Sequence, residues 1–432
     1  MNTMKFVGLL LFRLYKTRVP FFFFLILFIL GGCASSVKLK NENLSAQFSY
    51  SGDYLAPQVT AFQFADDSLR ILFSIPDKGL LFKNVGDKFM ALLNLEYAFY
   101  SSYSSSQIVD SGSVNFQVES PAENAPFSGA VDVKFIAESR LILKLVFRDV
   151  HRNTEAQRHI PLKGVKVISQ QRVLFSDSTG NPVFENYVSG SGKLKLDPGS
   201  LSFDSFWVRC YFKEYPLAIL PFRVVDDPVF EMRSDSVFKL YRSDLNELVL
   251  RKNGIYFFQS DTSGIEGFTV SRFDADFPKV TRAEQLIEST RYITTRKEYL
   301  QLMNEADKKA ALDRFWLEIG GQPERARNLI RSYYNRVQEA NRLFSSYLEG
   351  WKTDRGMIHM IFGKPQSVYR NAETEQWTYS NIPGFPDMLF LFRKMNNPFT
   401  ENDYALIRQP LYENVWYIAV DQWRQGRIVN EN

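Results

Sequence analysis

The sequence predicts an α+β protein with several domains: N-terminal antiparallel β-sandwich regions, a helical middle segment and a small C-terminal α+β domain. Three observations support this fold class. Alternating apolar and polar residues dominate up to about residue 277, helical spacing follows up to 349, and short strands and a helix return after 350. The chain has 432 residues, 45% of them hydrophobic and 15% aromatic. This length and composition suffice for several hydrophobic cores.

The N-terminus, residues 1–32, has the features of a secretory signal. Its first eighteen residues contain four basic and no acidic side chains, and an apolar run follows at 21–30. Gly31 and Gly32 then precede Cys33. Small residues before a cysteine are typical of a bacterial lipoprotein signal, in which the cysteine thiol takes the lipid. The alternative is a transmembrane anchor, which needs about twenty apolar residues, whereas this run has about ten.

The residues after Cys33 predict where the protein resides. Acyl chains such as palmitate on Cys33 give stable membrane anchoring when several are present. The next residue is Ala34 and not the aspartate that commonly retains lipoproteins in the inner membrane, so we expect the outer membrane. Residues 34–38 lack the acidic cluster with which some bacteria direct lipoproteins to the cell surface, which favours the periplasmic face. Residues 33–45 are interpreted as a tether.

Two β-rich regions are expected after the tether. In 46–165, apolar runs are separated by turn residues about every ten residues, the rhythm of an antiparallel sandwich. The second region, 166–277, has a similar pattern. There, Asn253-Gly254 stands between two apolar runs and predicts a tight hairpin, because both residues tolerate positive φ. The two regions form either two sandwich-like domains or one elaborated domain.

A helical segment is expected at 278–349. The capping-box pattern from Thr281 to Glu284 predicts its start. A long helix is predicted to begin at Pro323, because proline suits the first helical position and the following apolar residues fall three or four apart. Gly350 is placed to end this helix.

Composition excludes several classes of function. A net charge of +4 gives no reason to expect nucleic acid. Cys210 lies in a predicted strand and is interpreted as a small buried side chain. The three histidines, His151, His159 and His359, have no metal-ligand spacing, so we expect neither a metal nor a cofactor.

The stretch from Gly350 to Pro365 resembles the GWxTD-domain proteins. It reads Gly-Trp-Lys-Thr-Asp-Arg-Gly from 350 to 356 and Gly-Lys-Pro from 363 to 365, and Trp377 and Trp423-Arg424 fit the same pattern. The resemblance covers about 278–432. The lipoprotein signal and the β-rich first half fit GWxTD-domain-containing lipoproteins as well. That family has no established molecular function, so the resemblance implies an architecture and no reaction.

The motif has a structural and a functional interpretation. In the structural one, Trp351 is buried at an elbow, Thr353 or Asp354 caps the following helix, and Asp354 and Arg355 fix the angle by charge-assisted hydrogen bonds. In the functional one, Trp351, Asp354 and Arg355 contact a ligand or partner. The residues considered for such a contact are Gly350, Trp351, Thr353, Asp354, Arg355, Gly356, Gly363, Pro365, Trp377, Trp423 and Arg424.

The order of elements in 350–432 is similar to that of the small SmpA/OmlA-type lipoproteins of the outer-membrane β-barrel assembly machinery. Both have a short helix, a Gly-x-Pro turn and a strand with Trp and Tyr, here around Trp377. This similarity implies an α+β module that serves as a scaffold at the membrane.

We therefore expect a non-enzymatic binding or scaffold protein, whose partner is an unidentified outer-membrane or envelope protein. One alternative is glycan or lipid binding, with Tyr97, Tyr100 and Tyr103 as candidate contacts. The other is a glycan or peptidoglycan hydrolase, which needs paired carboxylates. Glu349 and Asp354 flank the motif, but their spacing enforces no such pair.

Overall fold

The computed structural model describes residues 38–48, 55–120, 125–136, 138–165, 167–185, 187–225 and 231–430. The predicted signal peptide, Cys33 and the first residues of the tether lie outside these ranges. The fold class is α+β, as predicted. None of the helices in the described ranges is both long enough and apolar enough to cross a membrane.

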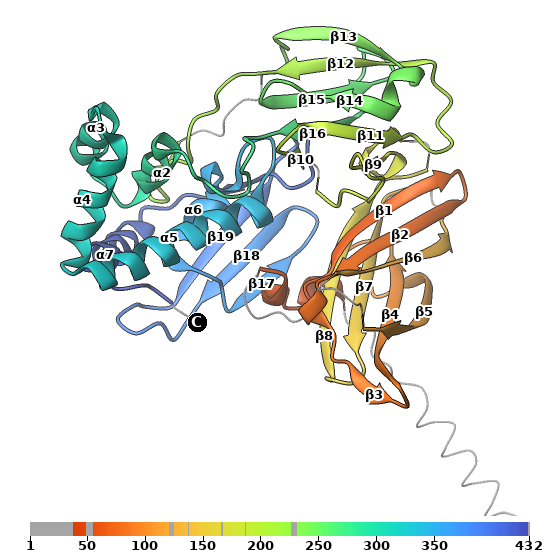
Figure 1. Cartoon of the computed structure of the whole chain (residues 1–432), viewed down its shortest axis with the longest axis horizontal. Coiled ribbons are helices and arrows are strands. Elements are labelled where there is room, and N and C mark those ends of the chain that lie inside the picture. Colours follow the sequence, from red (N-terminus) through yellow and green to blue (C-terminus); the bar gives the residue numbers. More distant parts are fainter. Residues whose placement is uncertain are drawn as a thin grey trace, which may run out of the picture. The chain divides into compact units, whose positions relative to one another are not determined.

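The first β region contains two antiparallel sheets that share one core (Figure 1). One sheet has the order β1 (Gln58–Ala65), β2 (Ser68–Ile75) and β6 (Phe127–Lys134). The other has the order β3 (Lys83–Val85), β4 (Lys88–Tyr100), β7 (Leu141–Asp149) and β8 (Thr154–Leu162), and β5 (Ile108–Glu119) pairs with β4. Phe73 of the first sheet packs on Phe147 of the second, with ring centroids 5.2 Å apart. The antiparallel pattern predicted here is confirmed.

The second β region has its own core and two further sheets. The larger has the order β10 (Tyr187–Val188), β16 (Phe268–Arg272), β15 (Gly254–Gln259), β12 (Ser205–Tyr211) and β13 (Ser236–Tyr241). The smaller has the order β14 (Leu248–Val249), β11 (Lys193–Asp197) and β9 (Leu174–Ser176). The pairing of β10 with β16 is parallel, and the other pairings are antiparallel.

The hairpin predicted at Asn253-Gly254 is wrong. The apolar run before it, β14, pairs with β11 of the smaller sheet, and the run after it, β15, pairs with β12 and β16. The chain thus changes sheets at this point. Gly254 is required for a different reason, since a Cβ atom there would lie 2.4 Å from the backbone oxygen of Tyr211.

Helices α2 to α7 and a four-stranded sheet, residues Ala283–Arg424, make up a part that we call the C-terminal module. Its helices are α2 (Ala283–Ser289), α3 (Arg296–Asn304), α4 (Lys308–Gly320), α5 (Pro323–Phe344), α6 (Asp354–Phe362) and α7 (Tyr412–Arg424). Its antiparallel sheet has the order β17 (Ser367–Arg370), β18 (Thr374–Tyr379), β19 (Met388–Lys394) and β20 (Tyr404–Leu406).

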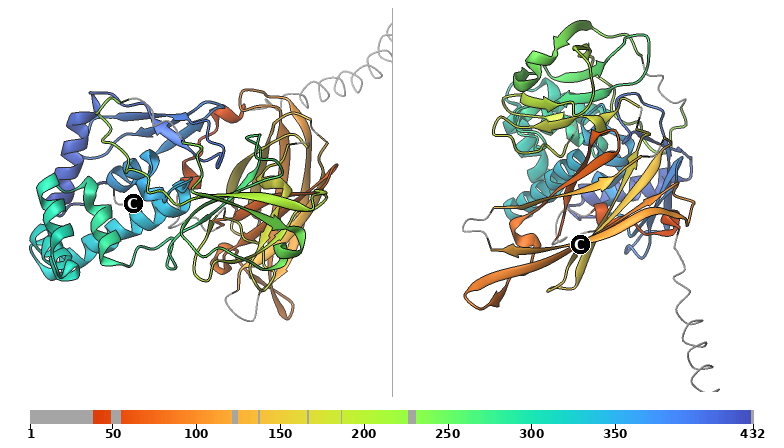
Figure 2. Two further views of the ribbon diagram at one scale, coloured as in Figure 1. Left: turned by 90° about the horizontal axis from the view of Figure 1, so that it is seen from above. Right: turned by 90° about the vertical axis from the view of Figure 1, so that its right-hand side faces the viewer.

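Helices α5 and α6 lie against one face of this sheet (Figures 1 and 2). Phe344 of α5 contacts Trp377, and Phe362 of α6 contacts Phe390, with ring centroids 5.4 Å and 5.2 Å apart. Trp377 and Phe390 are cross-strand partners, so both contacts are on the same face. The apolar stripe predicted along α5 is thus its core-facing side.

Residues 39–48 are packed, although the sequence placed most of them in a tether. They form two 3₁₀ turns, Leu39–Asn41 and Ser45–Phe48. The backbone N–H of Leu44 donates to the carbonyl of Val368 at 2.8 Å. The Phe48 ring is stacked on Phe344, with centroids 5.6 Å apart. Leu44 and Phe48 therefore belong to the core of the C-terminal module, whereas Leu39 packs with Tyr100 and Tyr103 of the first β region.

Two helix boundaries differ from the prediction. Helix α2 begins at Ala283, and Thr281 donates to Asp276 at 2.6 Å instead of capping the helix, so the predicted capping box is wrong. Helix α5 starts at Pro323 as predicted, but it ends at Phe344, well before Gly350. The side chain of Ser345 bonds the Asn341 carbonyl at 2.6 Å and turns the chain there.

Candidate functional site

Gly350 lies where the chain after α5 folds back against that helix. It opens a 3₁₀ turn, η7 (Gly350–Lys352), and its N–H donates to the Ser345 hydroxyl at 3.0 Å. A Cβ atom on Gly350 would lie 1.8 Å from the carbonyl oxygen of Ala340. The N–H of Trp351 donates to the Asn341 side chain at 3.2 Å. The glycine is therefore needed for close approach of two backbone segments, and not for ending α5.

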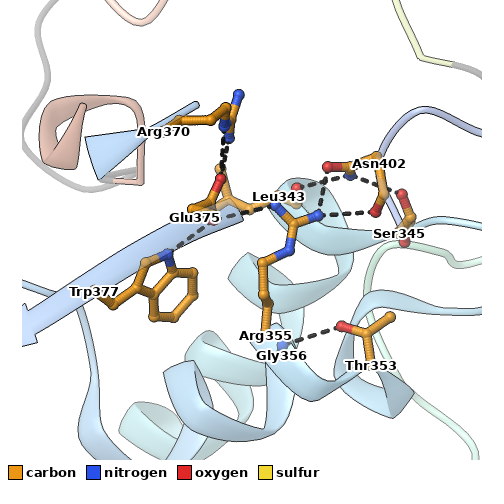
Figure 3. Close-up of polar contacts among 9 residues, drawn as sticks. All are labelled: Leu343, Ser345, Thr353, Arg355, Gly356, Arg370, Glu375, Trp377 and Asn402. Carbon is orange, nitrogen blue, oxygen red and sulfur yellow. Dashed lines mark hydrogen bonds and ion pairs between the residues drawn. The ribbon is translucent and has the colours of Figure 1, made fainter. Parts of the chain in front are cut away.

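Thr353 caps α6, as the structural interpretation predicts (Figure 3). Its hydroxyl accepts from the N–H of Gly356 at 3.0 Å and donates to the carbonyl of Gly350 at 2.7 Å. A Cβ atom on Gly356 would lie 1.9 Å from the same carbonyl oxygen. The cap and the two glycines thus fix the angle between η7 and α6.

Asp354 connects the start of α6 to the end of β20. Its carboxylate accepts from the N–H of Leu406 at 2.7 Å and from the Arg408 guanidinium at 2.5 Å. Both side chains are about nine-tenths buried, with exposed fractions of 9% for Asp354 and 10% for Arg408. Such a paired and buried carboxylate holds two segments together and is not open to a substrate.

Arg355 and Glu375 form the centre of a buried charge network (Figure 3). Arg355 donates to Glu375 at 3.3 Å and to the side chain of Asn402 at 2.5 Å. Glu375 also accepts from the Trp377 indole at 2.8 Å and from Arg370 at 2.7 Å. Burial would raise the pKa of Glu375, but the guanidinium groups of Arg370 and Arg355 outweigh it and hold the pKa below its usual range.

The aromatic residues of the pattern are core residues. Exposed fractions are 2% for Trp351 and 0% for both Trp377 and Trp423. Trp423 donates its indole N–H to the carbonyl of Ile361 at 3.0 Å, and Arg424 binds Glu298 at 2.6 Å. A contact of these tryptophans with a partner stays a prediction, and it would require the module to open.

Gly363 and Pro365 lie after α6 and complete the motif. Gly363 has φ +78° and ends the helix, as predicted, and its carbonyl accepts from the Tyr379 hydroxyl at 2.8 Å. Pro365 is buried directly before β17. Most residues from Gly350 to Pro365 are therefore buried and pack as part of the core.

The remaining candidates from the sequence do not form a reactive site. Tyr100 and Tyr103 are buried with Leu39, so they do not form the exposed platform that glycan binding would need. Burial raises the pKa of the Cys210 thiol. The described residues contain no cluster of three or more His, Cys, Asp or Glu side chains that is suited to a metal ion.

These features describe an α+β protein whose C-terminal module is organised around a buried turn motif. Residues 254–425 match the GWxTD domain, so the chain contains this domain. The match begins at Gly254, upstream of the expected boundary at 278. Strand β15 begins there, and its Phe257 ring packs on Phe399 of the module, with centroids 5.2 Å apart. A search among curated proteins finds no match to the chain.

The structure shows an exposed surface that the sequence analysis did not identify. We call it the edge patch and define it as Trp207, Val237, Lys239 and Tyr241, which share one face of β12 and β13. Their apolar members are 38% to 53% exposed. The Lys239 ammonium lies 5.6 Å from the Trp207 ring and 5.4 Å from the Tyr241 ring. The run from 236 to 241 has the composition of a core strand, so its pattern does not predict that it is exposed.

Proposed function

We propose that the chain is a lipid-anchored cell-envelope protein, attached through Cys33 at the periplasmic side of the outer membrane. In this proposal it acts as a non-enzymatic binding or scaffold component, and the edge patch contacts the partner protein. The observation that carries the proposal is the contrast between the two aromatic sites. The motif is buried and internally paired, whereas the edge patch exposes aromatic side chains.

The edge patch has the properties of a protein-binding surface. Strand β13 ends its sheet, and no further strand pairs with it in the part of the chain that the structure describes. Soluble proteins usually protect such an edge, because its free N–H and C=O groups can pair with another chain. An extended segment of a partner can add there as a further strand. Trp207 and Tyr241 are of the residue types that dominate binding energy at interfaces.

The packing of residues 39–48 supports a scaffold that is held close to the membrane. Lipid on Cys33 would be five residues from Lys38, which corresponds to about 18 Å even in extended chain. Leu39 is fully buried directly after that point. An anchored protein of this kind would present its surfaces to partners near the membrane and could not reach far into the periplasm.

Two equally exposed tyrosines allow a matched test of the edge patch. Tyr241 in the patch and Tyr417 on α7 are both 53% exposed. We expect photo-crosslinking in living cells, with benzoylphenylalanine in place of Tyr241, to give one specific adduct with an envelope protein. The same probe at Tyr417 should not give that adduct. Crosslinked products are identified by mass spectrometry after purification in detergent.

A second test uses the variant K239E, which reverses the charge that lies between the rings of Trp207 and Tyr241. It should reduce the Tyr241 adduct severalfold and leave the amount and thermal stability of the protein unchanged, because Lys239 is exposed. The proposal is contradicted when Tyr241 gives no adduct, or when both tyrosines give the same one. W351A and W423A are unsuitable for this purpose, since both side chains are buried.

A further inference from the structure

A cleft of about 480 Å³ lies where the two β regions meet the C-terminal module. Strand β8 contributes His159, and Lys163 follows the end of that strand. The second β region contributes residues around Ser169 and Thr269, and the module contributes residues 397–402 and Tyr404. An adjoining hollow of about 700 Å³ shares Glu185 and other lining residues with it. The volume is in the range of small-molecule sites.

The charged groups of this cleft already face opposite charges within the protein. Arg370 pairs with Glu375 at 2.5 Å. Glu401 pairs with Lys394 at 2.5 Å and Lys163 at 3.5 Å. Burial would raise the pKa of Glu401, but Lys394, Arg140 and Lys163 lower it to about 2. A charged ligand would therefore find no unmatched charge among these groups.

His159 and Glu185, which also line the cleft, have polar or oppositely charged neighbours as well. His159 lies 3.2 Å from the carboxylate of Glu42. Glu185 accepts from the amide of Gln58 at 2.7 Å, and the positive charge of Arg342 favours its ionised form. Burial still raises the pKa of Glu185 above its usual value. A neutral ligand fits this balance better than a charged one.

Two neutral hydroxyl groups in the cleft, in contrast, have no hydrogen-bond partner within the described ranges. The hydroxyl groups of Ser169 and Thr269 are buried, with residue exposures of 5% and 3%, and neither forms a hydrogen bond within the described ranges. Ser169 precedes the 3₁₀ turn Gln170–Arg172 and yet does not cap it. A buried hydroxyl without a partner costs about 1–3 kcal/mol, and a ligand in the cleft could supply the missing hydrogen bond.

We propose that this cleft binds a neutral, multiply hydroxylated ligand, a short segment of a glycan. Sugar hydroxyls donate and accept hydrogen bonds, as the side chains of Ser169 and Thr269 require. Two aromatic residues, Tyr187 and Tyr404, also line the cleft, and the apolar faces of sugar rings can pack against such side chains. This proposal goes beyond the scaffold function, since the cleft and the edge patch share no residues.

The test uses the double variant S169A/T269V of the full-length chain in detergent. Titration calorimetry measures binding of the N-acetylglucosamine tetramer and of maltotetraose, with tetra-alanine as a peptide probe. Because the hydroxyl groups have no partner in the free protein, the double variant should melt at the wild-type temperature or above it. We expect at least one tetrasaccharide to bind, and the double variant to bind it at least about tenfold more weakly.

The matched control is S271A. Ser271 lies two positions after Thr269 on β16 and its hydroxyl is likewise buried without a partner in the described part, but it does not line the cleft. This variant should bind the saccharide as the wild type does. The proposal is overturned when neither tetrasaccharide binds at millimolar concentration, when the double variant binds unchanged, or when only tetra-alanine binds.

Discussion

Replacing Gly350 with alanine is expected to unfold the C-terminal module under conditions in which the wild type is folded. The added methyl carbon would lie 1.8 Å from the oxygen and 2.5 Å from the carbon of the Ala340 carbonyl. Neither side can move easily, because Ala340 is fully buried within α5 and Gly350 is bonded to Ser345. We expect a loss of more than about 4 kcal/mol in the free energy of unfolding, measured by urea denaturation.

Gly321 provides the matched control for this substitution. It also follows a helix of the module, has φ +69°, and has no atom within 4 Å of an added Cβ. The variant G321A should therefore lose only about 1–2 kcal/mol, the cost of a left-handed backbone for alanine. If G350A were no less stable than G321A, the close contact between η7 and α5 would be refuted.

Replacing Glu375 with alanine is expected to have the second-largest effect, a loss of about 3–5 kcal/mol. The substitution leaves Arg355, 2% exposed, without its carboxylate partner in the core. The control D313A removes an exposed pair with Lys309 on α4, whose side chains are 53% and 81% exposed. An exposed pair of this kind contributes little to the free energy of unfolding, so D313A should lose far less stability than the Glu375 variant. Equal losses for both variants would contradict a buried network.

The pH dependence of stability gives an independent check on Glu375. Its pKa is lower in the folded protein than its usual value, so its ionised form stabilises the fold above the unfolded-state pKa of about 4.3. This contribution is lost as the pH falls below that value. In E375Q no such contribution exists, so the stability difference between wild type and variant should shrink on acidification. A difference that is constant from pH 7 to pH 3 would contradict the assignment.

Local signals in the sequence predicted those parts of the fold that local interactions determine. The alternation in β2, the apolar stripe of α5 and the cap at Thr353 follow from strand and helix geometry alone. The alternation predicted for β1 is wrong, because three consecutive residues of that strand, 61–63, are buried. Asn253-Gly254 carries an equally strong local signal, yet the strands on either side of it join different sheets. The pairing of each strand with partners far away in the sequence, and not the turn between them, determines the structure at this point.

The candidate surfaces were beyond prediction for the same reason. Ser169, Thr269 and Glu401 are distant in the sequence, and they meet only because three parts of the fold are packed together. The apolar strand β13 ends its sheet, and five of its six residues are exposed, which its own apolar pattern does not predict. For the motif, composition indicated buried tryptophans, but the contact of Gly350 with Ala340 depends on how the chain folds back after Phe344.

The GWxTD motif holds the module together from within, and amide hydrogen exchange can test this structural claim. The N–H groups of Gly350, Trp351 and Gly356 are bonded to the side chains of Ser345, Asn341 and Thr353. We predict that these three amides exchange as slowly as the amide of Val337, which is fully buried in the middle of α5. Fast exchange at all three positions while Val337 stays protected would contradict the claim and would show a mobile loop available to a partner.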